Sequence, residues 1–242
     1  MNLDLGEKVK VVTFDLDDTL WDMKPVLVNA EQRVQHWLEE FCPEVTARYT
    51  VESLREFKWQ IILQNPQLQH QISELRKVAM TEVLLSCDYP RAQARKLAEE
   101  SFEIFIEARH QVAFFEGALD MLEELSEQYV LGAVTNGNAN VYRLGLGDYF
   151  SFTVSAEDVN ASKPSLEPFM AAQHKAGVGF TEMVHIGDHP QKDVAAAKAA
   201  GCKAIWVNFH DTQWTLDESP DGEVSHLAQL PPLIAGLNSD WR

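Results

Sequence analysis

Hydrophobic and polar residues follow different periods in different parts of the chain. A compact apolar run from Val9 to Phe14 has the length and composition of a short buried strand, and it breaks into the acidic segment Asp15–Thr19. From Trp21 to about His110 glycine is almost absent, and apolar residues recur at helical spacing. This pattern predicts an all-helical unit of about four helices.

Downstream of Gly117 short apolar runs alternate with amphipathic stretches. The expected strands are Tyr129–Val134, Phe152–Val154, Met183–Ile186 and Ala204–Val207. Helices are expected from Ala118, around Val141, over Glu167–Lys175 and over Asp193–Ala200. Such alternation implies a parallel sheet covered on both faces, so we expect an α/β core of residues 1–20 and 111–242 interrupted by a helical domain, residues 21–110. The segment beyond Phe209 is acidic and predicts no regular structure.

The charge of the chain excludes several kinds of partner. It has 37 acidic and 20 basic residues, a formal net charge of −17. Nucleic acid and anionic membranes are therefore disfavoured, and a phosphorylated substrate is repelled unless its site contains a local positive group. No apolar run approaches the ~18 residues of a membrane span, and the acidic start does not fit a secretory signal. We expect a cytoplasmic protein whose three cysteines are reduced.

Polar side chains follow three of the expected strands. Asp15 and Asp17 follow the first, Thr135 and Asn136 follow the second, and Asp188 follows a later one. Ligands of open parallel sheets bind outside the carboxyl ends of the strands. We therefore expect these side chains to meet at one edge of the sheet.

These clusters have the composition of a metal and phosphate site. Two carboxylates that face one point repel each other unless a cation lies between them, and Mg²⁺ suits a site made of oxygens. Lys163 supplies a point charge for a phosphoryl oxygen, and Asp193 either supports the metal or caps a helix. Each pattern also has an ordinary explanation, as a helix-capping loop, a turn or a solvated lysine.

Four segments, taken in order, resemble the motifs of a known family. FDLDDT, VTNGN, SKP and GDHPQKD are similar to the four motifs of the haloacid dehalogenase (HAD) superfamily. The resemblance extends over nearly the whole chain and includes Leu144–Phe150 and Ala196–Asn208. It implies a Rossmann-like parallel-sheet core with an inserted all-helical cap domain, which corresponds to the helical stretch described above.

The resemblance also implies roles for the acidic residues. Asp15 would be the nucleophile and a Mg²⁺ ligand. Asp17 would be the general acid and base, would bind the metal through its backbone carbonyl, and would be positioned by Thr19. Asp188 would bind Mg²⁺, and Asp193 would support both the metal and Lys163 without binding the metal directly.

The other matching residues would hold the transferring group. By the same resemblance Thr135, Asn136 and Lys163 would bind the phosphoryl group. Mg²⁺ and Lys163 would offset the repulsion between a carboxylate and a phosphate monoester, and Asp17 would protonate the leaving alkoxide. A phospho-aspartyl intermediate would form and be hydrolysed in a second step.

We therefore expect a Mg²⁺-dependent phosphatase that hydrolyses a small phosphorylated metabolite, as a monomer or a homodimer. Three alternatives stay open: a 2-haloacid dehalogenase, a sugar phosphomutase, and a non-catalytic protein that binds a phosphometabolite. The second aspartate, Asp17, and the expected ligand Asp188 favour phosphorus chemistry over dehalogenation, because a halide leaves without an acid.

The substrate is less well indicated. The motif variants and the helical cap resemble bacterial phosphatases that act on flavin mononucleotide or on phosphorylated intermediates of riboflavin synthesis. Trp21, Trp37 and Trp59 are candidates for stacking on a flat ring, although aromatic residues at helical spacing more often belong to a core.

Overall fold

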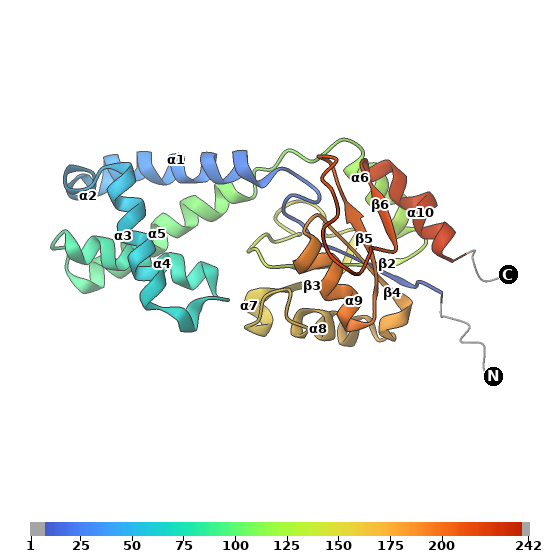
Figure 1. Cartoon of the computed structure of the whole chain (residues 1–242). Coiled ribbons are helices and arrows are strands. Elements are labelled where there is room, and N and C mark those ends of the chain that lie inside the picture. The colour runs from blue at the N-terminus through green and yellow to red at the C-terminus, as the bar shows by residue number, and fades with distance from the viewer. Residues whose placement is uncertain (1–7, 239–242) are drawn as a thin grey trace. The chain divides into compact units, whose positions relative to one another are not determined.

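The computed structural model describes residues 8–238. These residues divide into two compact units, which are described separately (Figure 1). One contains the residues up to Asp22 together with those from Ala113 onward, and the other is Met23–Val112. The first unit is an α/β fold and the second is entirely helical.

A parallel sheet forms the centre of the α/β unit. Within residues 8–238 it has six strands in the order β3-β2-β1-β4-β5-β6, and every neighbouring pair is parallel. The strands are β1 Val11–Phe14, β2 Val130–Thr135, β3 Phe150–Ser155, β4 Met183–Gly187, β5 Lys203–Val207 and β6 Gly222–Val224. The chain adds strands on one side of β1 and then on the other, so the strand order reverses between β1 and β4. This reversal is the switch point where α/β proteins bind ligands.

Helices cover both faces of the sheet, as the alternating sequence pattern predicts. Figure 1 shows α6 and α10 on one face and α8 and α9 on the other. The bounds of the elements around the sheet are α6 Ala118–Ser126, α7 Ala156–Val159, α8 Glu167–Ala176, η2 Phe180–Glu182, α9 Ala196–Ala200, η4 Leu227–Gln229 and α10 Leu230–Leu237. The expected α/β fold with a Rossmann-like parallel sheet is confirmed.

Three local expectations are wrong. Residues 141–145 form turns instead of a helix, because Asn140 Oδ1 accepts the backbone N–H groups of Tyr142 and Arg143 and Gly145 takes a φ of +74°. The helix expected over Asp193–Ala200 begins earlier, as the π-helical turn η3 (Pro190–Ala195), and continues as α9. The segment beyond Phe209 contributes β6 and α10, because Val224, Leu230 and Ile234 bury against the rest of the unit.

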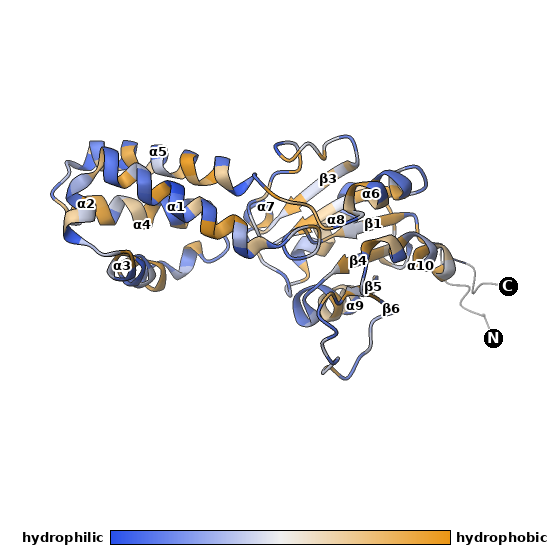
Figure 2. Ribbon diagram, turned by 90° about the horizontal axis from the view of Figure 1, so that it is seen from above, coloured by the Kyte–Doolittle hydropathy of each residue, from blue (hydrophilic) through white to orange (hydrophobic). Residues whose placement is uncertain are grey.

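The helical unit contains five α-helices among the described residues, where the sequence predicts about four. They are α1 Met23–Phe41, α2 Pro43–Arg48, α3 Val51–Gln64, α4 Ile72–Ser86 and α5 Arg91–Arg109, with the 3₁₀ turn η1 Pro66–Leu68 after α3. Figure 2 shows hydrophobic and hydrophilic residues alternating along these helices. Val26, Ala30, Val34 and Leu38 form the buried stripe of α1, because residues three or four apart share a helix face.

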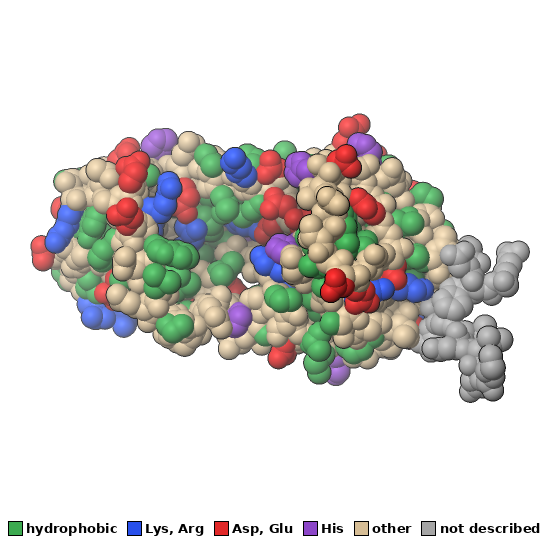
Figure 3. Space-filling model, in the orientation of Figure 1, with side chains coloured by type: hydrophobic (Ala, Val, Ile, Leu, Met, Phe, Trp, Pro, Cys, Tyr) green, Lys and Arg blue, Asp and Glu red, His purple; other side chains and the backbone are tan. Residues whose placement is uncertain are grey.

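The surface and the cysteines agree with the composition. Acidic side chains are spread over the face shown in Figure 3. Cys42, Cys87 and Cys202 are buried free thiols. Within residues 8–238 none of the helices combines the length and the hydrophobicity that a membrane crossing requires.

Candidate active site

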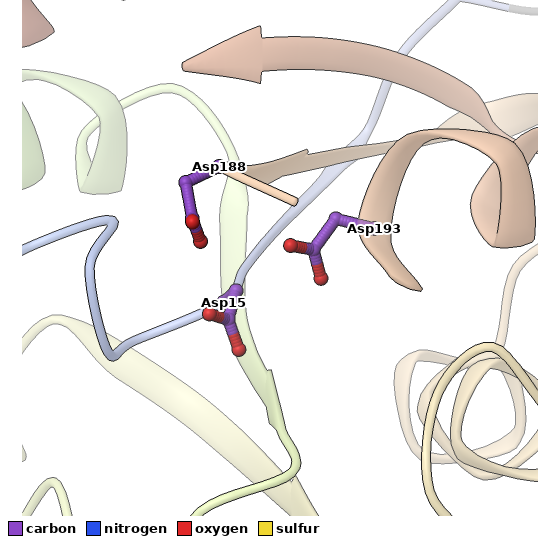
Figure 4. Close-up of side chains that lie close together, drawn as sticks. All are labelled: Asp15, Asp188 and Asp193. Carbon is purple, nitrogen blue, oxygen red and sulfur yellow. The ribbon is translucent and has the colours of Figure 1, made fainter. Parts of the chain in front are cut away.

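Three carboxylates meet at the carboxyl edge of the sheet. Asp15 follows β1, Asp188 follows β4, and Asp193 lies in η3. β1 and β4 are neighbouring strands with Phe14 opposite Ile186, so Asp15 and Asp188, one and two residues further along, emerge at the same edge of the sheet. Oxygens of the three carboxylates lie within 4.8 Å of one another, and Figure 4 shows the side chains facing a common space.

A buried ammonium group joins two of these carboxylates. Lys163 Nζ donates to Asp15 Oδ1 at 2.8 Å, to Asp193 Oδ1 at 2.6 Å and to the Val134 carbonyl at 2.6 Å. Burial by itself lowers the pKa of Lys163, but the two carboxylates outweigh burial and raise this pKa. Lys163 is therefore a fixed positive charge in a protein that is otherwise strongly acidic.

The carboxylates are not equivalent. Burial raises the pKa of Asp15 to about 8; Lys163 opposes this effect, and Asp193 and Asp17 add to it. The pKa of Asp188 is raised to about 6, first by burial and then by Asp193 and Asp18. Burial would also raise the pKa of Asp193, but Lys163 and His185 outweigh it, so that this pKa is well below its ordinary value. Negative charge is thus in excess at this edge of the sheet.

This charge pattern fits a divalent cation. Asp15 and Asp188 each offer a carboxylate oxygen to a site made entirely of oxygens, the donor set that Mg²⁺ prefers. A cation beside them would favour their ionised forms, which burial alone disfavours. The residues present therefore fit the expected metal. Asp193 Oδ1 is already held by Lys163, which agrees with a supporting role outside the metal shell.

The loop after β2 holds Lys163 by its backbone. Asn136 Nδ2 donates to the Lys163 carbonyl at 2.9 Å, and Asn136 Oδ1 accepts the Lys163 N–H at 2.8 Å. Thr135 Oγ1 accepts the N–H of Gly137 at 3.0 Å. Asn136, which is expected to contact the phosphoryl group, therefore fixes Lys163, the lysine expected to bind the same group.

The loop after β1 is also held by side-chain hydrogen bonds. The hydroxyl of Thr19 accepts the Asp188 N–H at 3.1 Å and donates to Asp188 Oδ1 at 3.3 Å. Trp21 Nε1 donates to Asp17 Oδ1 at 3.0 Å. Thr19, expected beside Asp17, thus supports Asp188, and the fully buried Trp21 orients Asp17.

Most of the predicted residues line one pocket of about 160 Å³. Its lining residues are Asp15, Asp17, Asp18, Thr135, Asn136, Gly137, Lys163, Asp188, His189, Lys192 and Asp193. Thr19 is fully buried and hydrogen-bonded to Asp188, a lining residue of the pocket. A pocket of this size suits a phosphoryl group with a cation, because pockets for whole drug-sized ligands are typically about 300 Å³ or larger.

Sequence reasoning missed Lys192 and His185 and left His189 without a role. The ring of His189 caps η3, because Nδ1 accepts the N–H groups of Gln191 and Lys192. Lys192 brings a second cation to the pocket. His185 is 1 % exposed and contacts Asp193 from inside β4. The available signal was a histidine within the apolar run Met183–Ile186, where a polar side chain needs a buried partner.

The sheet, its switch point and the carboxylates that flank a buried lysine are the arrangement of an α/β enzyme with an anion-binding edge. The sequence pattern of the haloacid dehalogenase-like hydrolases matches residues 12–207. The chain belongs to this family of hydrolases, as its four motifs predict.

Related proteins carry two activities. The 5-amino-6-(5-phospho-D-ribitylamino)uracil phosphatase YigB of Escherichia coli is 29 % identical over 94 % of this chain and 97 % of its own. A phosphoglycolate phosphatase of Neisseria meningitidis is 28 % identical over 96 % of this chain and 94 % of its own. The solved structure of a 2-haloacid dehalogenase from Pseudomonas syringae is 43 % identical, with a TM-score of 0.90, over 95 % of this chain and 99 % of that one.

Proposed function

We propose that this hydrolase is a Mg²⁺-dependent phosphatase that acts on a small phosphomonoester through a phospho-aspartyl intermediate. The observation that carries the proposal is the Lys163 ammonium held between Asp15 and Asp193, beside an excess of carboxylates. An anionic nucleophile and an anionic phosphate can meet only where fixed positive charge offsets their repulsion.

Each proposed role follows from a contact. Asp15 attacks phosphorus, the bond to the leaving alkoxide breaks, and Asp17, oriented by Trp21, gives that alkoxide a proton. Asp17 then takes a proton from the water that attacks the phospho-aspartate, which releases phosphate and restores Asp15. Lys163 places a fixed positive charge beside the phosphoryl group, and Asn136 fixes the Lys163 backbone. When bound by Asp15, Asp188 and the Asp17 carbonyl, Mg²⁺ supplies further positive charge at the phosphoryl group.

Hydrolysis of p-nitrophenyl phosphate by the purified protein tests this proposal. Asp15→Asn removes the nucleophile and should lower phosphate release by at least about 10³-fold. The same change at Asp120, an exposed residue of α6, should leave the rate within about twofold. Retained turnover in the Asp15→Asn protein would exclude Asp15 as the nucleophile.

The metal has a test that needs no substrate. Mg²⁺ should raise the melting temperature of the protein, because a ligand that binds only the folded state stabilises it. Asp188→Asn should abolish most of that increase, and chelation should stop phosphate release. An unchanged melting temperature on addition of Mg²⁺ would contradict the metal site.

Dehalogenation is the second candidate, favoured by the 43 % identical solved structure. Phosphatase activity is preferred because Asp17 lies in the pocket, where an acid is needed for an alkoxide but not for a halide. Chloride release from 2-chloropropionate without metal, in the absence of phosphatase activity, would reverse this preference. A phosphomutase would transfer the phosphoryl group without releasing phosphate, and a binding protein would do neither.

We further propose a flavin mononucleotide or riboflavin-pathway phosphate as the substrate. The YigB relative supports this choice, since its name specifies a phosphorylated ribitylaminouracil. Of the three candidate tryptophans, Trp21 is fully buried, Trp37 packs on the helical core and Trp59 is 56 % exposed. Burial excludes Trp21 from stacking on a ligand, and Trp59 is the most exposed of the three. A screen of phosphorylated metabolites with Mg²⁺, including flavin mononucleotide and phosphoglycolate, ranks the substrates.

A further inference from the structure

A buried histidine contacts the site from within the sheet. His185 in β4 pairs in register with Thr13 in β1, and the His185 Nδ1 lies 2.9 Å from Thr13 Oγ1. Its Nε2 lies 3.3 Å from Asp193 Oδ1. The ring of Phe169 packs against the imidazole at 90° with centroids 5.0 Å apart. Both ring nitrogens therefore have partners, and packing fixes the plane of the ring.

The partners determine where the ring proton lies. Asp193 is held ionised by Lys163, so its oxygens can only accept hydrogen bonds. Nε2 must carry the proton, since an unprotonated Nε2 would set two lone pairs against each other. Burial lowers the pKa of His185, which keeps the ring neutral, so that Nδ1 accepts the hydroxyl proton of Thr13. The other acceptor near that hydroxyl, the Val184 carbonyl, is farther away, at 3.4 Å.

We propose that Thr13 and His185 are positioning residues that hold Lys163 through Asp193. Asp193 Oδ1 accepts from both His185 Nε2 and Lys163 Nζ, and Asp193 Oδ2 accepts the N–H of His189 at 3.0 Å. Three donors from different elements thus fix the carboxylate in one orientation. That orientation sets the position of the ammonium group that also donates to Asp15.

This inference rests on the proposed phosphatase for its kinetic readout. Loss of the His185 donor would let the Asp193 carboxylate rotate and Lys163 shift away from the transition-state geometry. Small displacements of a positioning group reduce the chemical step more than ground-state binding. The expected signature is a lower kcat with little change in KM.

His185→Phe and His185→Gln form the test pair. Phenylalanine keeps the ring and removes both hydrogen bonds, whereas glutamine retains an N–H donor near the position of Nε2. We expect His185→Phe to lower kcat for p-nitrophenyl phosphate by about tenfold to a hundredfold, with KM within about threefold. His185→Gln should recover most of that loss. Equal kcat values per folded molecule in wild type and His185→Phe would overturn the proposal.

A second variant covers the case in which His185→Phe does not fold. Thr13→Val keeps the shape of the side chain and removes the hydroxyl, so it should lower kcat less than His185→Phe and again leave KM nearly unchanged. Thr13→Ser retains the hydroxyl and should recover activity. A wild-type kcat in Thr13→Val would exclude Thr13 as a positioning residue.

A measurement without substrate separates this inference from the proposed function. Two-bond ¹⁵N–¹H correlation spectra of the wild-type protein distinguish the tautomers, and the signal absent from His185→Gln identifies His185. We expect a neutral ring protonated at Nε2. A ring protonated at Nδ1 would overturn the inference even in an active phosphatase, and the expected tautomer would support it even if the substrate were not a phosphate.

Discussion

Lys163 is the residue on which the charge balance of the site depends. It is 2 % exposed, and all three of its ammonium protons are directed at oxygen atoms of other residues. Partnered buried charges are tolerated, whereas an unpartnered one destabilises the fold. Removal of the ammonium would take its cationic partner from Asp15 and one of three hydrogen-bond donors from Asp193.

Lys163→Met should therefore destabilise the metal-free protein at neutral pH by about 3–5 kcal/mol. The pKa of Asp15 is already raised to about 8 in the wild type, so Asp15 is largely protonated in both proteins below neutral pH. The pKa of Asp193, which Lys163 lowers in the wild type, would rise in the variant, so protonation of Asp193 would make the loss smaller as the pH falls towards 5. Urea unfolding of both proteins at about pH 7 and pH 5 without metal measures this difference. A loss of stability that is the same at both pH values would contradict the charge explanation.

The junction between β4 and η3 places Asp188 and Asp193 at the same point. Gly187, the last residue of β4, directly precedes Asp188, and a Cβ at this position would be 2.4 Å from Asp193 Cγ. That distance is far inside van der Waals contact, so a side chain would displace the carboxylate that holds Lys163. Glycine is required here because the Asp193 side chain lies against the backbone, and not because the backbone takes an unusual φ.

Gly187→Ala should reduce kcat by about tenfold or more, because Asp193 must move. Gly236→Ala is the matched control: a Cβ at Gly236 in α10 meets nothing within 4 Å. That change should leave activity intact and stabilise the protein by about 0.5–1 kcal/mol, since alanine is the better helix former. Equal activity in Gly187→Ala and wild type would show that the Asp193 position is not critical.

In the helical unit an ion-pair cluster joins three helices. Glu31 of α1 lies 2.6 Å from Arg76 of α4 and 4.0 Å from Lys58 of α3. The guanidinium of Arg76 also lies 3.5 Å above the ring of Phe105 in α5. Burial raises the pKa of Glu31, but Arg76 and Lys58 outweigh it and the pKa is lowered.

A carboxylate whose pKa is lower in the folded than in the unfolded protein stabilises the fold at pH values above its unfolded-state pKa. This stabilisation is lost as the pH falls through the pKa of the folded state. Glu31 is 48 % exposed, so screening limits the contribution of the cluster. Glu31→Gln should thus lower stability by about 0.5–1 kcal/mol at neutral pH and by less below about pH 4. Glu40→Gln, at an exposed position of the same helix, is the matched control and should change the stability measured by urea unfolding by less than about 0.5 kcal/mol.

At the scale of the whole molecule the acidic charge opposes the proposed substrate. The net charge is −17, and the pocket itself contains five aspartates and two lysines. Both the overall and the local field therefore repel a phosphate dianion before the cation binds, and a single Mg²⁺ does not cancel the local excess. Salt should screen this repulsion, because the Debye length falls to about 10 Å at 0.1 M.

We expect kcat/KM for p-nitrophenyl phosphate to rise by about two- to fivefold between about 0.02 and 0.2 M salt at saturating Mg²⁺. An uncharged osmolyte at the same osmolarity should have no effect. A decrease of kcat/KM with salt would show that attraction by Lys163, Lys192 and the metal outweighs the repulsion that the approaching substrate experiences.

The alternation of strands and helices, the helical insertion and the residues of the four motifs could all be predicted from the amino-acid sequence. These features are local: a run of apolar residues, a period or a short motif is enough to indicate each one. Asp15, Asp17, Thr135, Lys163, Asp188 and Asp193 were identified in this way and lie around one pocket. The turns at 141–145 were not, because side-chain capping by Asn140 competes with helical spacing there.

The interactions among these residues depend on the folded arrangement of the chain. Asn136 holds the Lys163 backbone and Thr19 supports Asp188, although 27 and 169 positions separate these pairs. His185 becomes part of the site only because parallel pairing sets it beside Thr13 and beneath Asp193. Hydrogen bonds across such separations depend on strand register and packing, which no local pattern encodes. The pKa values of the carboxylates also depend on the folded structure, because the carboxylates lose contact with water only when the chain folds around them.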